Sequence, residues 1–328
     1  MERDRFVIEA AEAESMAKEL GLSVLQLLPS LVKSAQKLAR PPISKYHVGA
    51  VGLGSDGRIF FGVNLEFPGL PLHHSVHAEQ FLITNAAING ETQLLYIAVS
   101  SAPCGHCRQF MQEIRGANEI KILITSTETG DDRNQDLIFH PLSHFLTHPF
   151  GPDDLLGKDV PLLLEPHNNG LIFDDQNQNQ NQIKDSNNVG NDFKIHSNGF
   201  HTDHDEEFSR LKNAALEAAN KSHAPYSGCP SGVALMDSAG KVYKGLYTES
   251  AAYNPSLGPV QAALVAYVAS RGGGGGGYDK IVAGVLVEKE GVMVRQESTA
   301  KLILESIAPK CDFRVFNCNS SKKMCRKV

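Results

Sequence analysis

The sequence has no run of about 18 apolar residues, the length that a helix needs to cross a bilayer. Its start, Met1 to Phe6, is charged and leads into an amphipathic stretch, with no apolar segment of the kind a secretory signal carries. Six cysteines in 328 residues are too few for a disulfide scaffold, and two of them form a Cys-x-x-Cys pair. These absences predict a cytoplasmic protein without a membrane anchor.

An excess of basic residues is also missing. The chain has 31 Lys and Arg against 37 Asp and Glu, a formal net charge of -6. Because affinity for phosphate backbones comes mainly from clustered basic side chains, this balance argues against a dedicated nucleic-acid binder. With 41% hydrophobic and 21% charged residues, the composition is that of a globular protein. The length predicts two domains, each with its own core.

The first half of the chain alternates helical and strand patterns. Apolar residues recur at helical spacing over residues 22–38, before Pro41 and Pro42. Two apolar strands flank a turn at residues 55–58, the pattern of a hairpin. The strands of this hairpin are expected at 48–53 and 59–63. A helix 77–87, a strand 95–99, a helix after Pro103 and a strand 120–125 follow. This alternation predicts helices on a mixed sheet, the three-layer α/β class.

The second half repeats the first. Five turn and strand residues recur with a displacement of 183: Pro42, Ser44, Gly49, Gly57 and Gly62 are matched by Pro225, Ser227, Gly232, Gly240 and Gly245. The preceding helix recurs as residues 208–220. We infer the duplication of one α/β unit.

An Asn- and Gln-rich tract, Asp174 to Asp192, separates the two copies and lacks the apolar residues needed for a core. We therefore expect a disordered linker. The predicted organisation is a helical segment 1–40, a catalytic domain 41–155, a linker 156–200, a repeat 201–318 and a basic tail 319–328.

The chemistry is concentrated in two short motifs, His77-Ala-Glu79 and Pro103-Cys104-Gly-His-Cys107. One imidazole and two thiolates give a zinc ion three protein ligands and leave its fourth position open, as a catalytic site requires. Pro103 favours a helix start at the cysteines, where the helix dipole stabilises thiolates. Glu79, two residues from the histidine, is placed to carry protons without binding the metal.

A Cys-x-x-Cys pair alone is often half of a structural zinc site or a redox pair, and a lone histidine is more often a core or surface residue. A structural zinc site normally has a fourth protein ligand. With His77, Glu79, Cys104 and Cys107 present in this order, the sequence favours a catalytic zinc site with one Zn²⁺ per chain.

At these motifs the chain resembles the cytidine deaminase family, in its larger, two-domain homodimeric branch. The resemblance extends through the segments Gly62-Val-Asn-Leu-Glu66-Phe, Val76-His-Ala-Glu-Gln80, Pro103-Cys-Gly-His-Cys-Arg-Gln109, Pro225-Tyr-Ser and Pro230-Ser-Gly-Val-Ala234. It implies a duplicated three-layer α/β/α fold with a helical N-terminal segment. It also implies hydrolytic deamination of cytidine and deoxycytidine to uridine and deoxyuridine in pyrimidine salvage.

The resemblance further implies a nucleoside site. Asn64 and Glu66, with Leu65 between them, would hold the ribose hydroxyls, and Tyr46 would pack on the pyrimidine. Backbone groups at Ala78 and Ala102 would contact the edge of the base. A carboxylate and an amide two residues apart on a strand share one face, which suits a sugar diol.

The second repeat lacks the metal-binding residues. Where His77-Ala-Glu79 would recur, the chain has Gly258-Pro-Val-Gln-Ala262, and Cys311 and Cys318 have the wrong spacing. The resemblance implies that this degenerate domain forms the interface of a homodimer and helps to close the partner's active site.

Two other functions compete with nucleoside deamination. The same zinc chemistry could act on a nucleotide or on cytosine in RNA or DNA, which the acidic balance and the charge of Glu66 disfavour. Alternatively, the chain is a silent dimer that only binds a nucleoside or a partner protein, which the retained Glu79 disfavours.

Overall fold

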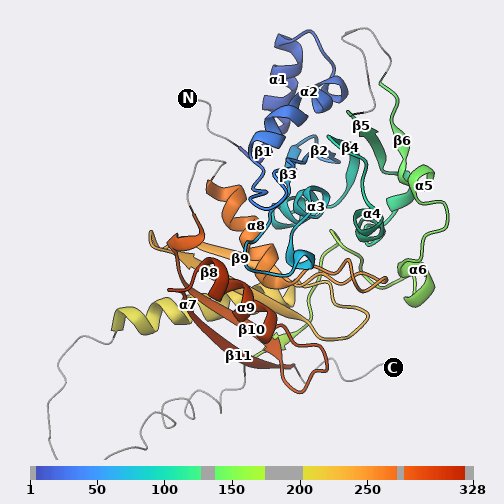
Figure 1. Ribbon diagram of the computed structural model, residues 1–328. Helices are drawn as coiled ribbons and strands as arrows, with labels where there is room; N and C mark the ends of the chain where they lie inside the picture. The colour runs from blue at the N-terminus through green and yellow to red at the C-terminus, as the bar shows by residue number, and fades with distance from the viewer. Residues whose placement is uncertain (1–4, 127–136, 174–201, 272–276, 322–328) are drawn as a thin grey trace, which may run out of the picture.

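Two repeats lie side by side in the computed structural model, the first in blue to green and the second in yellow to red (Figure 1). The structure describes residues 5–126, 137–173, 202–271 and 277–321. The Asn- and Gln-rich tract and most of the basic tail lie outside these residues. No helix of the described residues is long and apolar enough to cross a membrane.

The sheet of the first repeat has six strands in the order β1-β3-β2-β4-β5-β6. Their bounds are β1 Val7–Ile8, β2 Gly49–Gly54, β3 Ile59–Val63, β4 Leu94–Val99, β5 Lys121–Ile124 and β6 His140–Pro141. Strands β4 and β5 are parallel, and the other neighbouring pairs are antiparallel. The hairpin β2–β3 pairs Gly49 with Val63, so it has the register expected from the turn at residues 55–58.

The helices of the first repeat are α1 Ala10–Glu19, α2 Val24–Lys37, α3 Ala78–Ile88, α4 Gly105–Met111, α5 Leu142–Phe145 and α6 Pro152–Leu155. Helix α2 begins with a capping box, in which Ser23 Oγ accepts from Gln26 N and Gln26 Oε1 accepts from Ser23 N. The 3₁₀ helices are η1 Leu72–His74, η2 Ala117–Glu119 and, later in the chain, η4 Tyr278–Lys280.

Helices α2 and α3 cover opposite faces of this sheet. A Cβ atom on Gly49 would lie 2.8 Å from the carbonyl oxygen of Val32 in α2. A Cβ atom on Gly62 would lie 2.1 Å from the carbonyl oxygen of Ala78 in α3. Because Gly49 pairs with Val63, Gly49 and Gly62 point to different faces. The repeat therefore has three layers, and glycine allows each helix to approach its strand closely.

The second repeat has the same topology. Its sheet has the order β7-β11-β10-β8-β9, with β10 and β11 parallel, so β9-β8-β10-β11 corresponds to β3-β2-β4-β5. The elements are β7 Leu171–Ile172, α7 Thr202–Asn220, β8 Ser231–Asp237, β9 Val242–Leu246, α8 Pro259–Arg271, β10 Ile281–Lys289, α9 Glu297–Ile307 and β11 Asp312–Ser320. The predicted duplication of a three-layer α/β unit is confirmed.

Helices α3 and α8 pack against each other, and buried side chains of both repeats form one continuous hydrophobic core. Figure 1 shows α8 next to the first repeat. Residues 156–173, the described part of the expected linker, also lie at this boundary. Leu163 and Leu164 are buried there, and β7 adds a strand to the second sheet.

Candidate metal and catalytic site

The three expected metal ligands come from the N-terminal ends of two neighbouring helices. His77 is the N-cap residue of α3 and Cys104 that of α4, and Cys107 lies in the first turn of α4. Leu65 exchanges two backbone hydrogen bonds of 2.9 Å with Val76, which fixes the chain immediately before His77. The side chain of Leu65 is fully buried, so this residue acts through its backbone and its packing.

The spacing of the ligand atoms suits a tetrahedral zinc ion. The two sulfurs of Cys104 and Cys107 are 3.6 Å apart, and they lie 3.5 and 3.3 Å from Nδ1 of His77. Zinc–sulfur and zinc–nitrogen bonds of ordinary length in a tetrahedron place such atoms about 3.6 to 3.8 Å apart. Among the described residues, this is the one group of three such side chains close enough to hold a metal. The donor set therefore fits zinc and leaves one position open.

The two thiols are unequal before a metal binds. The pKa of the Cys104 thiol is lowered to about 3, mainly by the hydrogen bond with Cys107 and also by His77, against the effect of burial. The same contact, together with burial, raises the pKa of Cys107. Because zinc binds thiolates, its binding must displace the proton of Cys107.

Glu79 is placed to handle protons at this site. Its side chain is 5% exposed, and its Oε2 accepts from the sulfur of Cys107 at 3.3 Å. Burial raises the pKa of this carboxyl, although nearby donors oppose the shift. A carboxyl with a raised pKa accepts and returns a proton near neutral pH more readily than an exposed one.

Asn64 and Glu66 hold the loop of residues 43–48. Glu66 accepts from the backbone N–H groups of Ile43 and Ser44, each at 2.9 Å, and from the Ser44 hydroxyl. Asn64 donates to the carbonyl oxygen of Tyr46 at 2.9 Å and accepts from Val48 N at 3.0 Å. Both side chains therefore act on the loop that carries Tyr46.

Tyr46 lies at the surface, with 61% of its area exposed to solvent. Its hydroxyl lies 2.8 Å from Oγ of Ser101, the residue before Ala102. The structure thus brings Tyr46 to the segment that leads into Cys104. Ala102 is exposed and Ala78 is buried. Sequence reasoning missed Ser101, and the only signal was a hydroxyl placed beside the expected base-binding residue.

The second repeat replaces the metal-binding residues. Leu65 forms an isolated antiparallel β-bridge with Val76, and Thr248 forms the corresponding β-bridge with Leu257. The first residues of these bridges are 183 apart in sequence, but the second are 181 apart, because the intervening loop is two residues shorter. Gly258 therefore occupies the place of His77.

By the same correspondence Val260 occupies the place of Glu79. The correspondence is supported by the glycines that approach the two helices, because a Cβ atom on Gly245 would lie 2.1 Å from the carbonyl oxygen of Pro259. The described part of the second repeat contains no group of metal-ligating side chains.

Comparison with known proteins agrees with this arrangement. Two models of the cytidine and deoxycytidylate deaminase zinc-binding region match residues 23–124 and 142–301. "Cytidine deaminase 1" of Arabidopsis thaliana is 60% identical over 97% of this chain and 99% of its own length. The chain belongs to the cytidine deaminase family. "Cytidine deaminase 6" of the same plant is 49% identical over 94% of this chain and 97% of its own length.

A crystal structure of the cytidine deaminase from Mycobacterium tuberculosis covers 39% of this chain and 97% of its own, with 27% identity and a TM-score of 0.32. The family is zinc-binding, and the group of His77, Cys104 and Cys107 is where this chain fits the metal. The match to residues 142–301 covers a repeat without those ligands, so it reflects the duplicated fold.

Proposed function

We propose that this chain catalyses the hydrolytic deamination of cytidine and deoxycytidine, releasing ammonia and leaving uridine or deoxyuridine. The observation that carries the proposal is the triangle of His77, Cys104 and Cys107 with the buried carboxyl of Glu79 in contact with it. A structural zinc site has no use for a buried proton carrier beside an open coordination position.

Zinc bound by these three residues supplies the Lewis acidity that makes water nucleophilic near neutral pH. Glu79 takes a proton from the water as its oxygen attacks C4 of the base, and delivers this proton to N3. It then takes the second proton, from the new hydroxyl on C4, and transfers it to the amino group, which leaves as ammonia while the C4 carbonyl forms. This role needs a group that exchanges protons at working pH, and burial raises the pKa of Glu79 in that direction.

The proposed substrate contacts come from the loops around the metal site. Tyr46 packs on the pyrimidine, and the backbone of Ala78 and Ala102 contacts the base edge. Asn64 and Glu66 bind the ribose hydroxyls while they keep their hydrogen bonds to loop 43–48. The Glu66 carboxylate can do both, because a carboxylate accepts about four hydrogen bonds.

The wider setting is part of the same proposal. It comprises a cytoplasmic enzyme of pyrimidine salvage, with a catalytic domain at residues 41–155 and a degenerate repeat at 201–318. The chain acts as a homodimer through the degenerate repeat, without a membrane or nucleic-acid partner. The formal net charge of -6 supports a small substrate rather than a polyanion.

The test measures the loss of cytidine absorbance with the wild type, Glu79→Gln and Glu79→Ala, with the zinc content of each protein. Cytidine 5'-monophosphate and a cytosine-containing oligonucleotide are compared as substrates. We expect the wild type to favour the nucleosides, and the two variants to keep zinc but lose about 10²- to 10⁴-fold in kcat.

A matched control is Glu165→Gln, which changes a carboxylate outside the site and should leave turnover intact. Zinc-loaded wild type that converts only the nucleotide or the oligonucleotide would show that the substrate is wrong. Zinc-loaded wild type that converts none of them would show a silent domain.

A further inference from the structure

A cavity of about 330 Å³ lies between the two repeats. It is lined by Ala87 and Ile88 at the C-terminal end of α3, whereas His77 and Glu79 lie at the N-terminal end of that helix. The other walls come from residues 90–92 and 163–167, from α7 and the segment 221–223 that follows it, and from β9. The cavity is therefore separate from the zinc site and includes elements of both repeats.

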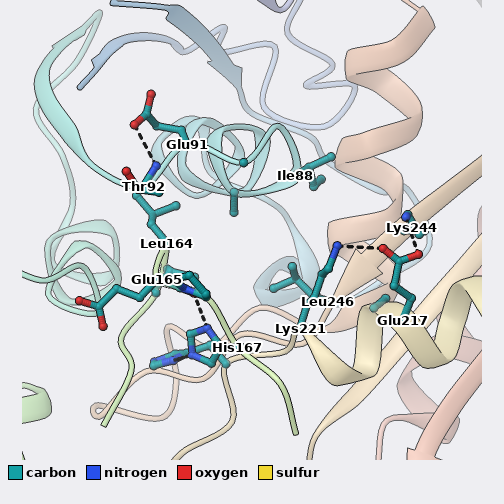
Figure 2. Close-up of a pocket in the computed structure, with 16 residues that line it drawn as sticks. Ile88, Glu91, Thr92, Leu164, Glu165, His167, Glu217, Lys221, Lys244 and Leu246 are labelled. Carbon is teal, nitrogen blue, oxygen red and sulfur yellow. Dashed lines mark hydrogen bonds and ion pairs between the residues drawn. The ribbon is translucent and has the colours of Figure 1, made fainter. Parts of the chain in front are cut away.

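Most of the cavity wall is apolar. Ile88, Leu164 and Leu246 face it, and Figure 2 shows them around its centre. His167 adds a ring whose nitrogens are both occupied, because Nδ1 contacts the carbonyl oxygen of Glu165 and Nε2 contacts Nδ1 of His223 at 3.1 Å. This part of the cavity suits a flat, apolar body.

Positive charge gathers at one end. Lys221 and Lys244 both contact the Glu217 carboxylate, at 2.8 and 2.9 Å, as Figure 2 shows. The hydrogen bonds from these lysines lower the pKa of Glu217, so the carboxylate is ionised at neutral pH. Two ammonium groups and one carboxylate leave one positive charge in excess. Each ammonium has three N–H donors, of which Glu217 needs one.

The two remaining carboxylates of the lining do not contact the lysines. Glu165 forms an ion pair with Arg115, and its carboxylate points away from the cavity in Figure 2. Glu91 is 3% exposed and accepts from Ser55 Oγ and Thr92 N, and it too points away.

We propose that this cavity binds a small amphipathic anion, an aromatic or apolar ring system that carries one negatively charged group. The charged group accepts from the N–H donors of Lys221 and Lys244 that Glu217 leaves free, and the ring lies along Leu164 and Leu246. Pockets that bind small molecules have volumes of about 300 to 1,000 Å³, mostly apolar walls and a few polar groups that fix orientation. The inference does not depend on the proposed deaminase activity.

The test uses the full chain and 8-anilinonaphthalene-1-sulfonate, an aromatic monoanion whose fluorescence rises in apolar surroundings. We expect one saturable site per chain, with affinity that weakens as salt is added. Lys221→Gln and Lys244→Gln should each weaken binding roughly three- to five-fold, the usual range for partly exposed charge pairs. N-phenyl-1-naphthylamine, the same ring system without the sulfonate, should bind more weakly, and neither substitution should change its affinity.

Three further variants locate the probe. Ile88→Trp fills the cavity and should remove the saturable signal, provided that its circular dichroism matches the wild type. Lys301→Gln removes another lysine with an i,i+4 Glu partner and should change nothing. Tyr46→Ser alters the surface near the proposed zinc site and should also change nothing.

No saturable binding, or binding that Lys221→Gln and Lys244→Gln leave intact, overturns the proposal even if Ile88→Trp does not fold. Loss of the signal in Tyr46→Ser overturns it as well, because the probe would then bind near the proposed zinc site instead.

Discussion

Glu66 and Glu249 hold the same loop in the two repeats, although within the described residues a group of candidate metal ligands occurs in the first repeat alone. Glu249 accepts from Tyr226 N at 2.9 Å, from Ser227 N at 3.1 Å and from the Ser227 hydroxyl. These contacts match those of Glu66 with a displacement of 183 residues. Holding the loop is therefore a function of this glutamate that does not depend on a nucleoside.

The paired substitutions Glu66→Gln and Glu249→Gln separate the two roles. Each should lower the free energy of unfolding by about 1 to 3 kcal/mol, because a carboxylate that accepts several hydrogen bonds is replaced. Only Glu66→Gln should also lower kcat/KM for cytidine. Chemical unfolding and steady-state kinetics measure the two effects, and an equal loss of activity in both variants would contradict the assignment.

Gly62 and Gly245 offer a second matched pair, because each lies against the start of a helix, α3 after His77 and α8 after Gly258. Alanine at Gly62 would put Cβ 2.1 Å from the Ala78 carbonyl oxygen, and alanine at Gly245 would meet that of Pro259 at 2.1 Å. Both variants should lose about 1 to 3 kcal/mol or more of stability, as overpacked cores do.

Only Gly62→Ala should also lose zinc, since it moves the start of α3 and with it His77. Metal analysis of the two purified variants, each beside its thermal unfolding curve, tests this. Zinc retained in full by a destabilised Gly62→Ala protein would show that the ligands tolerate the shift.

Local patterns in the sequence predicted the elements that form the site. The hairpin, α3, β4, α4 and β5 lie within a few residues of their expected bounds, because alternation, helical spacing and Pro103 are local signals. The positions of His77, Cys104 and Cys107 at helix starts were predicted for the same reason.

Contacts between distant segments were not predictable. The two-residue strands β1 and β7 are too short to show a pattern, and their pairing depends on where the chain leads them. The side chains of Asn64 and Glu66 were expected to face a sugar, but their loop contacts depend on how residues 43–48 fold back. The sequence placed the counterpart of His77 within Gly258 to Ala262, and the exact match to Gly258 follows from a loop that is two residues shorter.

Glu113 makes contacts of this kind, because its carboxylate belongs to the first repeat and its hydrogen-bond partners belong to the second. It is 0% exposed and accepts from Tyr226 OH at 2.6 Å and Ala251 N at 2.7 Å, with His223 Nε2 at 3.1 Å. Glu113→Gln leaves these donors badly matched, and removal of one partner from a buried charged network costs about 3 to 5 kcal/mol. Chemical unfolding should show this loss.

Glu165→Gln is the matched control, because its partner Arg115 is about half exposed. An exposed ion pair contributes about 0 to 1 kcal/mol, so this variant should be nearly neutral at pH 7. Equal losses in the two variants would mean that burial between the repeats adds nothing to the contact of Glu113.

The same Glu165 predicts a pH dependence. The hydrogen bond from Arg115 lowers the pKa of Glu165 below its usual 4.5, with further help from Leu162 N. The folded state then binds the proton less readily than the unfolded state does. The contribution of Glu165 to stability is therefore complete above about pH 4.5 and is lost as the pH falls through the lowered folded-state pKa.

Thermal unfolding of wild type and Glu165→Gln between pH 7 and pH 3 should give two melting temperatures whose small difference narrows in acid. A separation that stays constant with pH would show that the ion pair with Arg115 does not persist in solution.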